Sequence, residues 1–202
     1  MDPVISIIVI AFLGPVLVFL TRYVLKGKGR TAAASRLWFV SFCTFVVYYW
    51  LAKDKYIVTP LEPFYFALLW PIVAVLTFWL TERLNMKRSP MPLFRWMVYF
   101  LAGVIFAFVM DILSNALGWY TYIAGAAGST ILNPVTGGDV PAIVLLMLGV
   151  LLTGVFYLSD NAYVVLKRRI GAITTTYVLI GLSFIWGGFA WMIFDALVNL
   201  VK

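Results

Sequence analysis

The sequence predicts an all-α fold, a polytopic membrane helix bundle, on three observations. Of the 202 residues, 64% are hydrophobic and only 11% are charged, whereas a soluble domain carries about 25% charged residues. The apolar residues form long runs, and a helix needs about 20 such residues to cross a bilayer. The basic residues gather between these runs. We therefore expect a single transmembrane helical domain over residues 1–202, in a multi-pass protein of the cell membrane.

About six transmembrane helices are expected, bounded by charged residues, glycines and prolines. The N-terminal Met-Asp-Pro has neither the basic region nor the small-residue cleavage site of a signal peptide, so the first apolar run is interpreted as a retained helix. The predicted spans are residues 4–25, 37–52, 64–81, 96–117, 142–166 and 170–201.

The basic residues predict the orientation of these spans. Twelve of the 15 Lys and Arg residues lie in the first, third and fifth connections, when Arg22 at the end of the first span is counted with the first connection. By the positive-inside rule these connections are cytoplasmic and both termini are extracytoplasmic. Contacts with anionic membrane lipids explain short basic loops beside helix ends, so the net charge of +7 does not indicate a nucleic-acid partner.

The composition excludes several kinds of chemistry. Histidine is absent and Cys43 is the one cysteine, which excludes a disulfide framework, a His or Cys metal cluster and a thiol–His pair. There is no Asp-Asp-x-x-Asp motif for a Mg²⁺-bound diphosphate. We expect no metal and no cofactor, and any acid–base role must fall on a carboxylic acid.

Three acidic residues are candidate catalytic acids. Asp111 and Asp195 lie in the outer parts of predicted spans, and Glu62 lies at the entry of the third span. A charged group facing lipid at a helix centre costs about 2.5–3.5 kcal/mol, so both aspartates are expected to face the bundle interior or a cavity. No basic residue lies inside a span to pair with them. In a dry site the neutral acid is the cheaper form, which suits a proton donor. Glu82, by contrast, is expected to be solvated beside Arg83.

The two aspartates share an Asp-x-x-x-Asn pattern, which pairs Asp111 with Asn115 and Asp195 with Asn199. Positions i and i+4 lie on one face of a helix, so each amide could bind its aspartate or a shared ligand. The alternative is interhelical hydrogen bonding, worth about 1 kcal/mol in membranes.

Aromatic residues are frequent in the outer parts of the predicted spans, near Asp111 and Asp195. An interfacial aromatic belt explains many of them. The alternative is a cavity whose ring faces stabilise a carbocation and exclude water after an acid has protonated an alkene or epoxide. Two tryptophans flank Gly187 and Gly188, which allow another backbone or a substrate to approach closely. The candidate substrate-binding aromatic residues are Tyr65, Trp119, Tyr120, Tyr122, Trp186 and Trp191.

Residues 111–122 read Asp-Ile-Leu-Ser-Asn-Ala-Leu-Gly-Trp-Tyr-Thr-Tyr, followed by Gly125, Gly128 and a Pro-rich loop. This stretch of about 30 residues resembles the small integral-membrane terpene cyclases, of the bacterial indole-sesquiterpene and fungal meroterpenoid types and, more distantly, the small-subunit-type lycopene cyclases. The resemblance implies a cyclase acting on a linear prenylated, lipophilic isoprenoid substrate in the membrane. It also implies that Glu62 and Asp195 correspond to the acids of the meroterpenoid enzymes, and Asp111 to the Asp of the Trp-Tyr cluster.

The chain departs from these families in two places. Residues 133–141 read Asn-Pro-Val-Thr-Gly-Gly-Asp-Val-Pro where lycopene cyclases have Pro-x-Glu-Glu, which argues against a carotenoid substrate. The fungal enzymes commonly have seven helices, and six are predicted here.

Two other classes of protein stay open. In a proton- or cation-coupled transporter or channel, Asp111 and Asp195 would be relay or binding sites. In a non-catalytic lipid-binding membrane subunit, the acids would be structural. A retinal photoreceptor is disfavoured because no lysine lies inside a predicted span.

Overall fold

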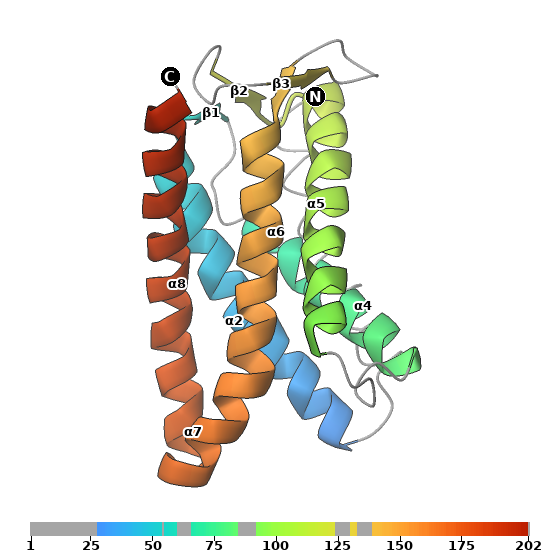
Figure 1. Cartoon of the computed structure of the whole chain (residues 1–202), viewed down its shortest axis with the longest axis vertical. Coiled ribbons are helices and arrows are strands. Elements are labelled where there is room, and N and C mark those ends of the chain that lie inside the picture. Colours follow the sequence, from blue (N-terminus) through green and yellow to red (C-terminus); the bar gives the residue numbers. More distant parts are fainter. Residues whose placement is uncertain are drawn as a thin grey trace.

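A computed structural model describes residues 28–53, 55–59, 66–84, 92–123, 130–132 and 139–201, which are mostly helical (Figure 1). The helices are α2 (Lys28–Ala52), α4 (Trp70–Arg83), α5 (Pro92–Leu117), α6 (Ala142–Tyr157), the π-helical turn η2 (Leu158–Ala162), α7 (Tyr163–Ile170) and α8 (Ala172–Val201). Two short antiparallel pairs join β1 (Ile57–Val58) to β2 (Thr121–Tyr122) and β3 (Thr130–Leu132) to β4 (Asp139–Pro141).

Four helical segments in the described part of the chain are long and apolar enough to cross a membrane. They are consistent with an all-α membrane helix bundle and match the second, fourth, fifth and sixth predicted spans. Their bounds are Ala32–Ala52, Leu93–Ser114, Ala142–Ile170 and Ala172–Leu200.

The first and third predicted spans have no matching helix of membrane-spanning length among the described residues. The span at residues 4–25 lies outside the described residues. Within the span predicted at 64–81, α4 begins only at Trp70 and has 14 residues, too few to cross a bilayer by themselves. Pro71 fits this start, because a helix tolerates proline in its first turn but not in its interior. The total of six spans stays a prediction.

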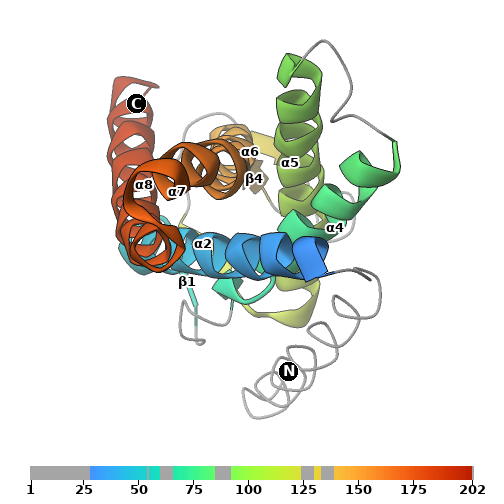
Figure 2. The same cartoon turned by 90° about the horizontal axis from the view of Figure 1, so that it is seen from below.

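Close packing of α6 against α5 and α8 forms the centre of the bundle. Seen from below, α2 runs along one side, and α6 lies between α5 and α8 (Figure 2). A Cβ placed on Gly103 of α5 would lie only 2.7 Å from the Cα of Gly149 on α6. A Cβ on Gly187 of α8 would lie 2.5 Å from the backbone oxygen of Thr44 on α2. Glycines therefore let these helix backbones meet, as small residues do in membrane bundles.

The chain reverses between α7 and α8 within one residue. Gly171 has φ +80, a conformation that glycine adopts at no steric cost. The last turn of α7 carries Lys167, Arg168 and Arg169, where cations favour the helix C-terminus. The predicted sixth span therefore begins two residues early at 170, since α8 starts at Ala172.

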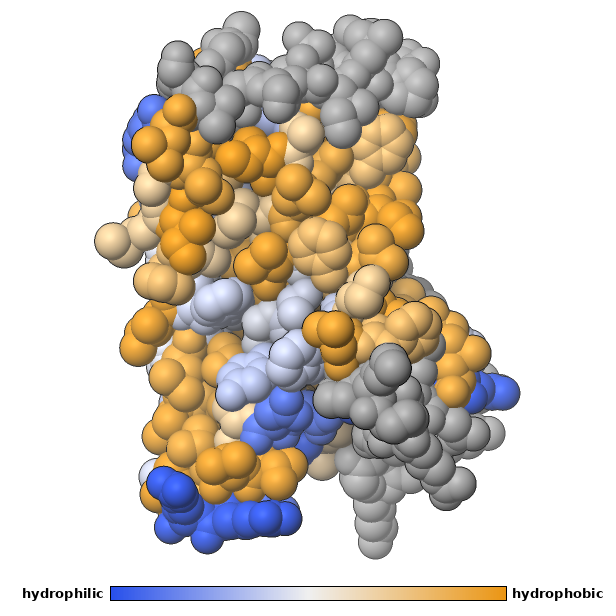
Figure 3. All heavy atoms as spheres, viewed as in Figure 1, coloured by the Kyte–Doolittle hydropathy of each residue, from blue (hydrophilic) through white to orange (hydrophobic). Residues whose placement is uncertain are grey.

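The two ends of the bundle differ in character. Hydrophobic side chains cover much of the described surface, and hydrophilic atoms gather at the end that carries α7 (Figure 3). We call this end, with Lys167–Arg169, the basic end. The opposite end carries β1 to β4 (Figure 1) and is called the strand end. Both α5 and α8 run toward the strand end, so Asp111 and Asp195 lie near it.

We predict that Gly103→Val lowers the stability of the bundle. The added side chain meets the Gly149 backbone, and overpacking of this kind costs about 1–3 kcal/mol. Thermal unfolding in detergent, followed by circular dichroism, measures the loss. Gly181→Val is the matched control, since a Cβ on Gly181 meets nothing within 4 Å. Equal melting temperatures for the two variants would contradict the packing described for α5 and α6.

Candidate functional site

Asp111 is a fully buried carboxyl group in the last two turns of α5. The helix ends at Leu117, and Gly118 adopts φ +66, which turns the chain back. The Trp119 amide then donates a hydrogen bond to the Ser114 carbonyl oxygen at 2.8 Å. This reversal carries residues 120–122 back over the helix end that holds Asp111.

Two tyrosines meet Asp111 as a result of this turn. The Tyr120 hydroxyl donates to Asp111 Oδ1 at 2.5 Å, and the Tyr122 hydroxyl donates to the same oxygen at 2.7 Å. Burial, with the nearby Asp111 carboxyl, raises the pKa of both Tyr120 and Tyr122 well above 10. Both phenols therefore stay protonated and remain hydrogen-bond donors at neutral pH.

Asp195 has a different environment. Its side chain is one-quarter exposed; the Tyr56 hydroxyl donates to Oδ1 at 2.5 Å, and Lys55 Nζ lies 2.5 Å from the same oxygen. The expectation that Asp195 has no ion-pair partner is wrong, because Lys55 reaches it from the connection after α2. Burial and the adjacent Asp195 raise the pKa of Tyr56. Asp195 is therefore held by a lysine and a phenol, whereas the two partners of Asp111 described above are both phenols.

The short β1–β2 pair links the two aspartates. Ile57 of β1 pairs with Tyr122 of β2, and the Ile123 amide donates to the Tyr56 carbonyl at 2.9 Å. The tyrosine that binds Asp111 is thereby fixed beside the tyrosine that binds Asp195. The structure places both carboxyl groups around one cluster of tyrosines at the strand end.

A small cavity lies within this cluster. Its volume is about 10 Å³, which is room for about one water molecule. An isoprenoid would enter only if these side chains moved apart. Five tyrosines and several apolar side chains line the cavity: Tyr48, Tyr49, Tyr56, Tyr120, Tyr122, Val144, Leu148 and Phe194, with Ala52 and Ile57.

The predicted substrate-binding tryptophans divide into two kinds. Trp191 is buried and packs edge-on against Tyr48 and Tyr56, with ring centroids 6.0 and 5.3 Å apart, so it belongs to the cluster. Trp119, which directly precedes Tyr120 in the sequence, is also buried. Its carbonyl oxygen accepts a hydrogen bond from Thr59 Oγ1 at 2.8 Å. Trp186 instead fills the space above Gly154 of α6 and donates to the Leu151 carbonyl at 3.3 Å.

Trp186 thus packs α8 against α6 and does not line the cavity of the tyrosine cluster. The neighbouring Gly187 has no side chain, which lets α8 pack directly against the α2 backbone. The Asp-x-x-x-Asn pattern is also not used as expected at its second occurrence. Asn199 is exposed, and among the described residues no hydrogen bond joins it to Asp195, which contacts Tyr56 and Lys55. Glu62 and Tyr65 lie outside the described residues, as does the side chain of Asn115.

Sequence reasoning missed Lys55 and Tyr56. The signal was present: Lys55 is one of very few bases in the predicted extracytoplasmic connections, and a tyrosine follows it. Tyr49 is a further member of the cluster, because its hydroxyl accepts a hydrogen bond from Trp70 Nε1 at 3.1 Å.

A second polar cluster lies on the side of the bundle away from the strands, and it was also missed. Arg95 of α5 is buried, with Nη1 2.9 Å from Asp160 Oδ2 and Nη2 3.9 Å from Glu82 Oε1. Its guanidinium lies 4.3 Å from the centroid of Phe156. The expectation of a solvated Glu82 is wrong, since its side chain is 15% exposed and lies beside Arg95. The cluster joins α4, α5 and η2, which is a structural role.

Within the described part of the chain, no group of three or more Asp, Glu, Cys or His side chains is placed to hold a metal ion. Comparisons with protein-family models, with curated proteins and with solved structures found no match to the chain. The arrangement around Asp111 defines a buried carboxyl group with two phenol donors and an aromatic surround.

We predict that Tyr120→Phe and Tyr122→Phe each destabilise the protein by about 0.5–1.5 kcal/mol, the net value of one hydrogen bond to a neutral group. Because both hydroxyls donate to one oxygen, the two substitutions are not independent. The double variant should therefore lose an unfolding free energy that differs from the sum of the two single losses. Unfolding in detergent at neutral pH measures each loss. Tyr177→Phe is the control, because Tyr177 is 72% exposed. Losses no larger than that of the control would show that the two hydrogen bonds do not stabilise the site.

Proposed function

We propose that the protein is an integral-membrane terpene cyclase, in which Asp111 protonates an alkene or epoxide of a linear, prenylated isoprenoid substrate. The observation that carries this proposal is the fully buried Asp111 carboxyl, held by two phenols beside an aromatic cluster. The resemblance of residues 111–122 to membrane terpene cyclases points to the same class of reaction.

The hydrogen bonds at Asp111 suit a proton donor. Both phenols bind Oδ1, so the proton of the neutral acid is carried by Oδ2. As that proton moves to a substrate carbon, negative charge develops on the carboxylate. The bonds from Tyr120 and Tyr122 then become charge-assisted and stronger. Donors already in place for a developing charge lower the barrier of the chemical step.

The remaining steps conserve atoms and electrons. The π electrons of the substrate alkene form the new C–H bond and leave a carbocation on the other carbon. A second alkene attacks this cation and closes a ring, and loss of a proton to the Asp111 carboxylate restores the acid. The product is an isomer of the substrate, so no cofactor is consumed. The ring faces of Tyr48, Tyr49 and Phe194 would stabilise the cation.

Asp195 is proposed to act through Tyr56. Its ion pair with Lys55 fixes the carboxylate that holds the Tyr56 hydroxyl, and Tyr56 lines the cavity. We regard Asp195 as a positioning residue and Asp111 as the acid. The small cavity volume means that substrate binding separates the lining side chains, and the apolar Val144 and Leu148 of α6 are the wall that faces the tyrosines.

We predict that Asp111→Asn lowers cyclisation by at least about 100-fold, because general acid catalysis contributes about 10²–10⁴. Membranes that contain the protein are incubated with a farnesylated indole or an epoxyprenyl aromatic compound, and cyclic products of unchanged mass are separated by chromatography and mass spectrometry. Tyr122→Phe retains the acid and loses one donor, so it should lose about tenfold or more in rate.

Tyr157→Phe, at an exposed tyrosine of α6, is the control and should keep full activity. Undiminished product from a folded Asp111→Asn variant would overturn the assignment of the acid. Proton flux in proteoliposomes that is lost in Asp111→Asn, with no cyclic product from either substrate, would favour the transporter instead.

We also propose that the protein lies in the cell membrane with six spans, the basic end in the cytoplasm and the C-terminus outside. The gathering of Lys167, Arg168 and Arg169 at one end supports this orientation. A bacterial alkaline phosphatase fused after Lys202 should be active, since that enzyme folds only after export. A fluorescent cytoplasmic reporter at the same position, with an inactive phosphatase, would contradict the orientation.

A further inference from the structure

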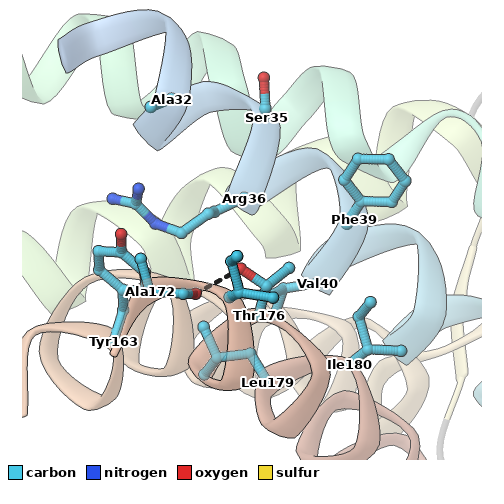
Figure 4. A pocket seen from close by; sticks show the side chains of 11 residues that line it. Ala32, Ser35, Arg36, Phe39, Val40, Tyr163, Ala172, Thr176, Leu179 and Ile180 are labelled. Atoms are coloured by element: carbon cyan, nitrogen blue, oxygen red, sulfur yellow. Dashed lines mark hydrogen bonds between the residues drawn. The ribbon is translucent and has the colours of Figure 1, made fainter. Parts of the chain in front are cut away.

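A groove between α2, α7 and α8 opens at the basic end of the bundle, far from the tyrosine cluster. Its volume is about 360 Å³, within the range of small-molecule sites. Figure 4 shows side chains from α2 and from α7 and α8 on its two sides, with Arg36 between them. The small residues Ala32 and Ala172 leave this space where the two helices diverge.

The walls of the groove are apolar. Val40 and Leu179 are buried at its base, and Phe39 and Ile173 are 60% and 77% exposed at its margin. Thr176 presents no free hydroxyl hydrogen to the groove, because its Oγ1 donates to the Ala172 carbonyl at 3.0 Å (Figure 4). Exposed apolar margins on a membrane bundle face lipid, so the groove opens toward acyl chains.

One end of this apolar groove is strongly basic. The Arg36 guanidinium lies 3.6 Å from the centroid of the Tyr163 ring, and Lys167 Nζ lies 5.7 Å from the same ring. Arg36 Nε donates to the Ser159 carbonyl at 3.4 Å, and its two terminal nitrogens donate to no described residue. Asp160 lies close enough to interact electrostatically with Arg36, but its Oδ2 is bound by Arg95 Nη1 at 2.9 Å. Two cations thus flank one aromatic ring with donors still available.

Arg36 lies near the first residue of an apolar helical segment of membrane-spanning length. It lies four residues inside the Ala32–Ala52 span, which is about 6 Å along a helix. An arginine at this depth extends its guanidinium toward the headgroups. Its planar fork binds phosphate oxygens in pairs, and phosphate is the anion that lipids present at this level.

We propose, with the orientation proposed above, that the groove is a binding site for one anionic phospholipid of the cytoplasmic leaflet, with the phosphate bound by Arg36 beside the Tyr163 ring and one acyl chain lying along Phe39, Ile173 and Leu179. The combination favours a phospholipid over a free phosphate, because the apolar groove continues directly from the cationic end. The exposed apolar margin favours a lipid over a soluble protein partner.

The test measures retained lipid on the full-length protein in detergent, after delipidation, by native mass spectrometry. Phosphatidylglycerol and phosphatidylcholine with identical chains are added separately. We expect one phosphatidylglycerol to be retained more tightly than phosphatidylcholine. Arg36→Gln should weaken phosphatidylglycerol binding about fivefold, the effect of one basic group near an anionic lipid, and leave phosphatidylcholine unchanged.

Arg83→Gln is the matched control. It removes one positive charge, also from a guanidinium placed over an aromatic ring, since Arg83 lies 5.3 Å from the centroid of Trp79. Arg83 is not part of the groove, so its loss should leave binding unchanged. Thr176→Phe fills the groove without a change of charge and should lower phosphatidylglycerol binding as well. This second variant keeps the test valid if Arg36→Gln does not fold.

Three results would overturn the proposal. Equal retention of the two lipids would exclude an anionic site. Equal loss in Arg36→Gln and Arg83→Gln would show that net charge, and not the groove, attracts the lipid. Displacement of bound phosphatidylglycerol by an equal concentration of glycerol phosphate, which has no acyl chains, would show a phosphate site without a lipid groove.

Discussion

The burial of the Asp111 carboxyl inside a membrane helix bundle is the constraint on which the strand end depends. A carboxyl group with no access to water needs hydrogen-bond donors, and a charged one without them is too costly to keep. Tyr120 and Tyr122 supply these donors on a single oxygen. They reach it because Gly118 takes a positive φ that turns the chain at the end of α5.

Other contacts at this end follow from the position of Tyr122. Its backbone pairs with Ile57 in the β1–β2 ladder, which holds Tyr56 beside it. Tyr56 in turn binds Asp195, and Lys55 neutralises that carboxylate. The two aspartates thus have separate roles: Asp111 is held by neutral donors and suits proton transfer, while Asp195 belongs to an ion pair that fixes a tyrosine. Asp160 and Glu82 belong to a third arrangement around Arg95, away from the strands.

Much of the helical framework could be predicted from hydropathy, because spans need long apolar runs and charges end them. Four predicted spans coincide with helices, and the placement of Asp111 and Asp195 near one end follows from them. The sequence also places Tyr120 and Tyr122 shortly after Asp111, and the structure shows that both hydroxyls bind its carboxyl group. The pairing of Lys55 with Asp195, and of Arg95 with Glu82 and Asp160, could not be predicted, because these contacts join residues far apart in the chain. The packing of Trp186 could not be predicted for the same reason, since the space that it fills is created by Gly154 on another helix.

The central claim is that a proton carried by Asp111 begins a cyclisation, and solvent isotope incorporation tests it most directly. Release of the product separates the lining side chains and lets the Asp111 carboxyl exchange its proton with D₂O, so a linear alkene substrate turned over in D₂O should give a cyclic product that carries one deuterium on carbon. The Asp111→Asn variant should give no such product. A cyclic product without deuterium, or deuterium incorporation that persists in Asp111→Asn, would contradict the account.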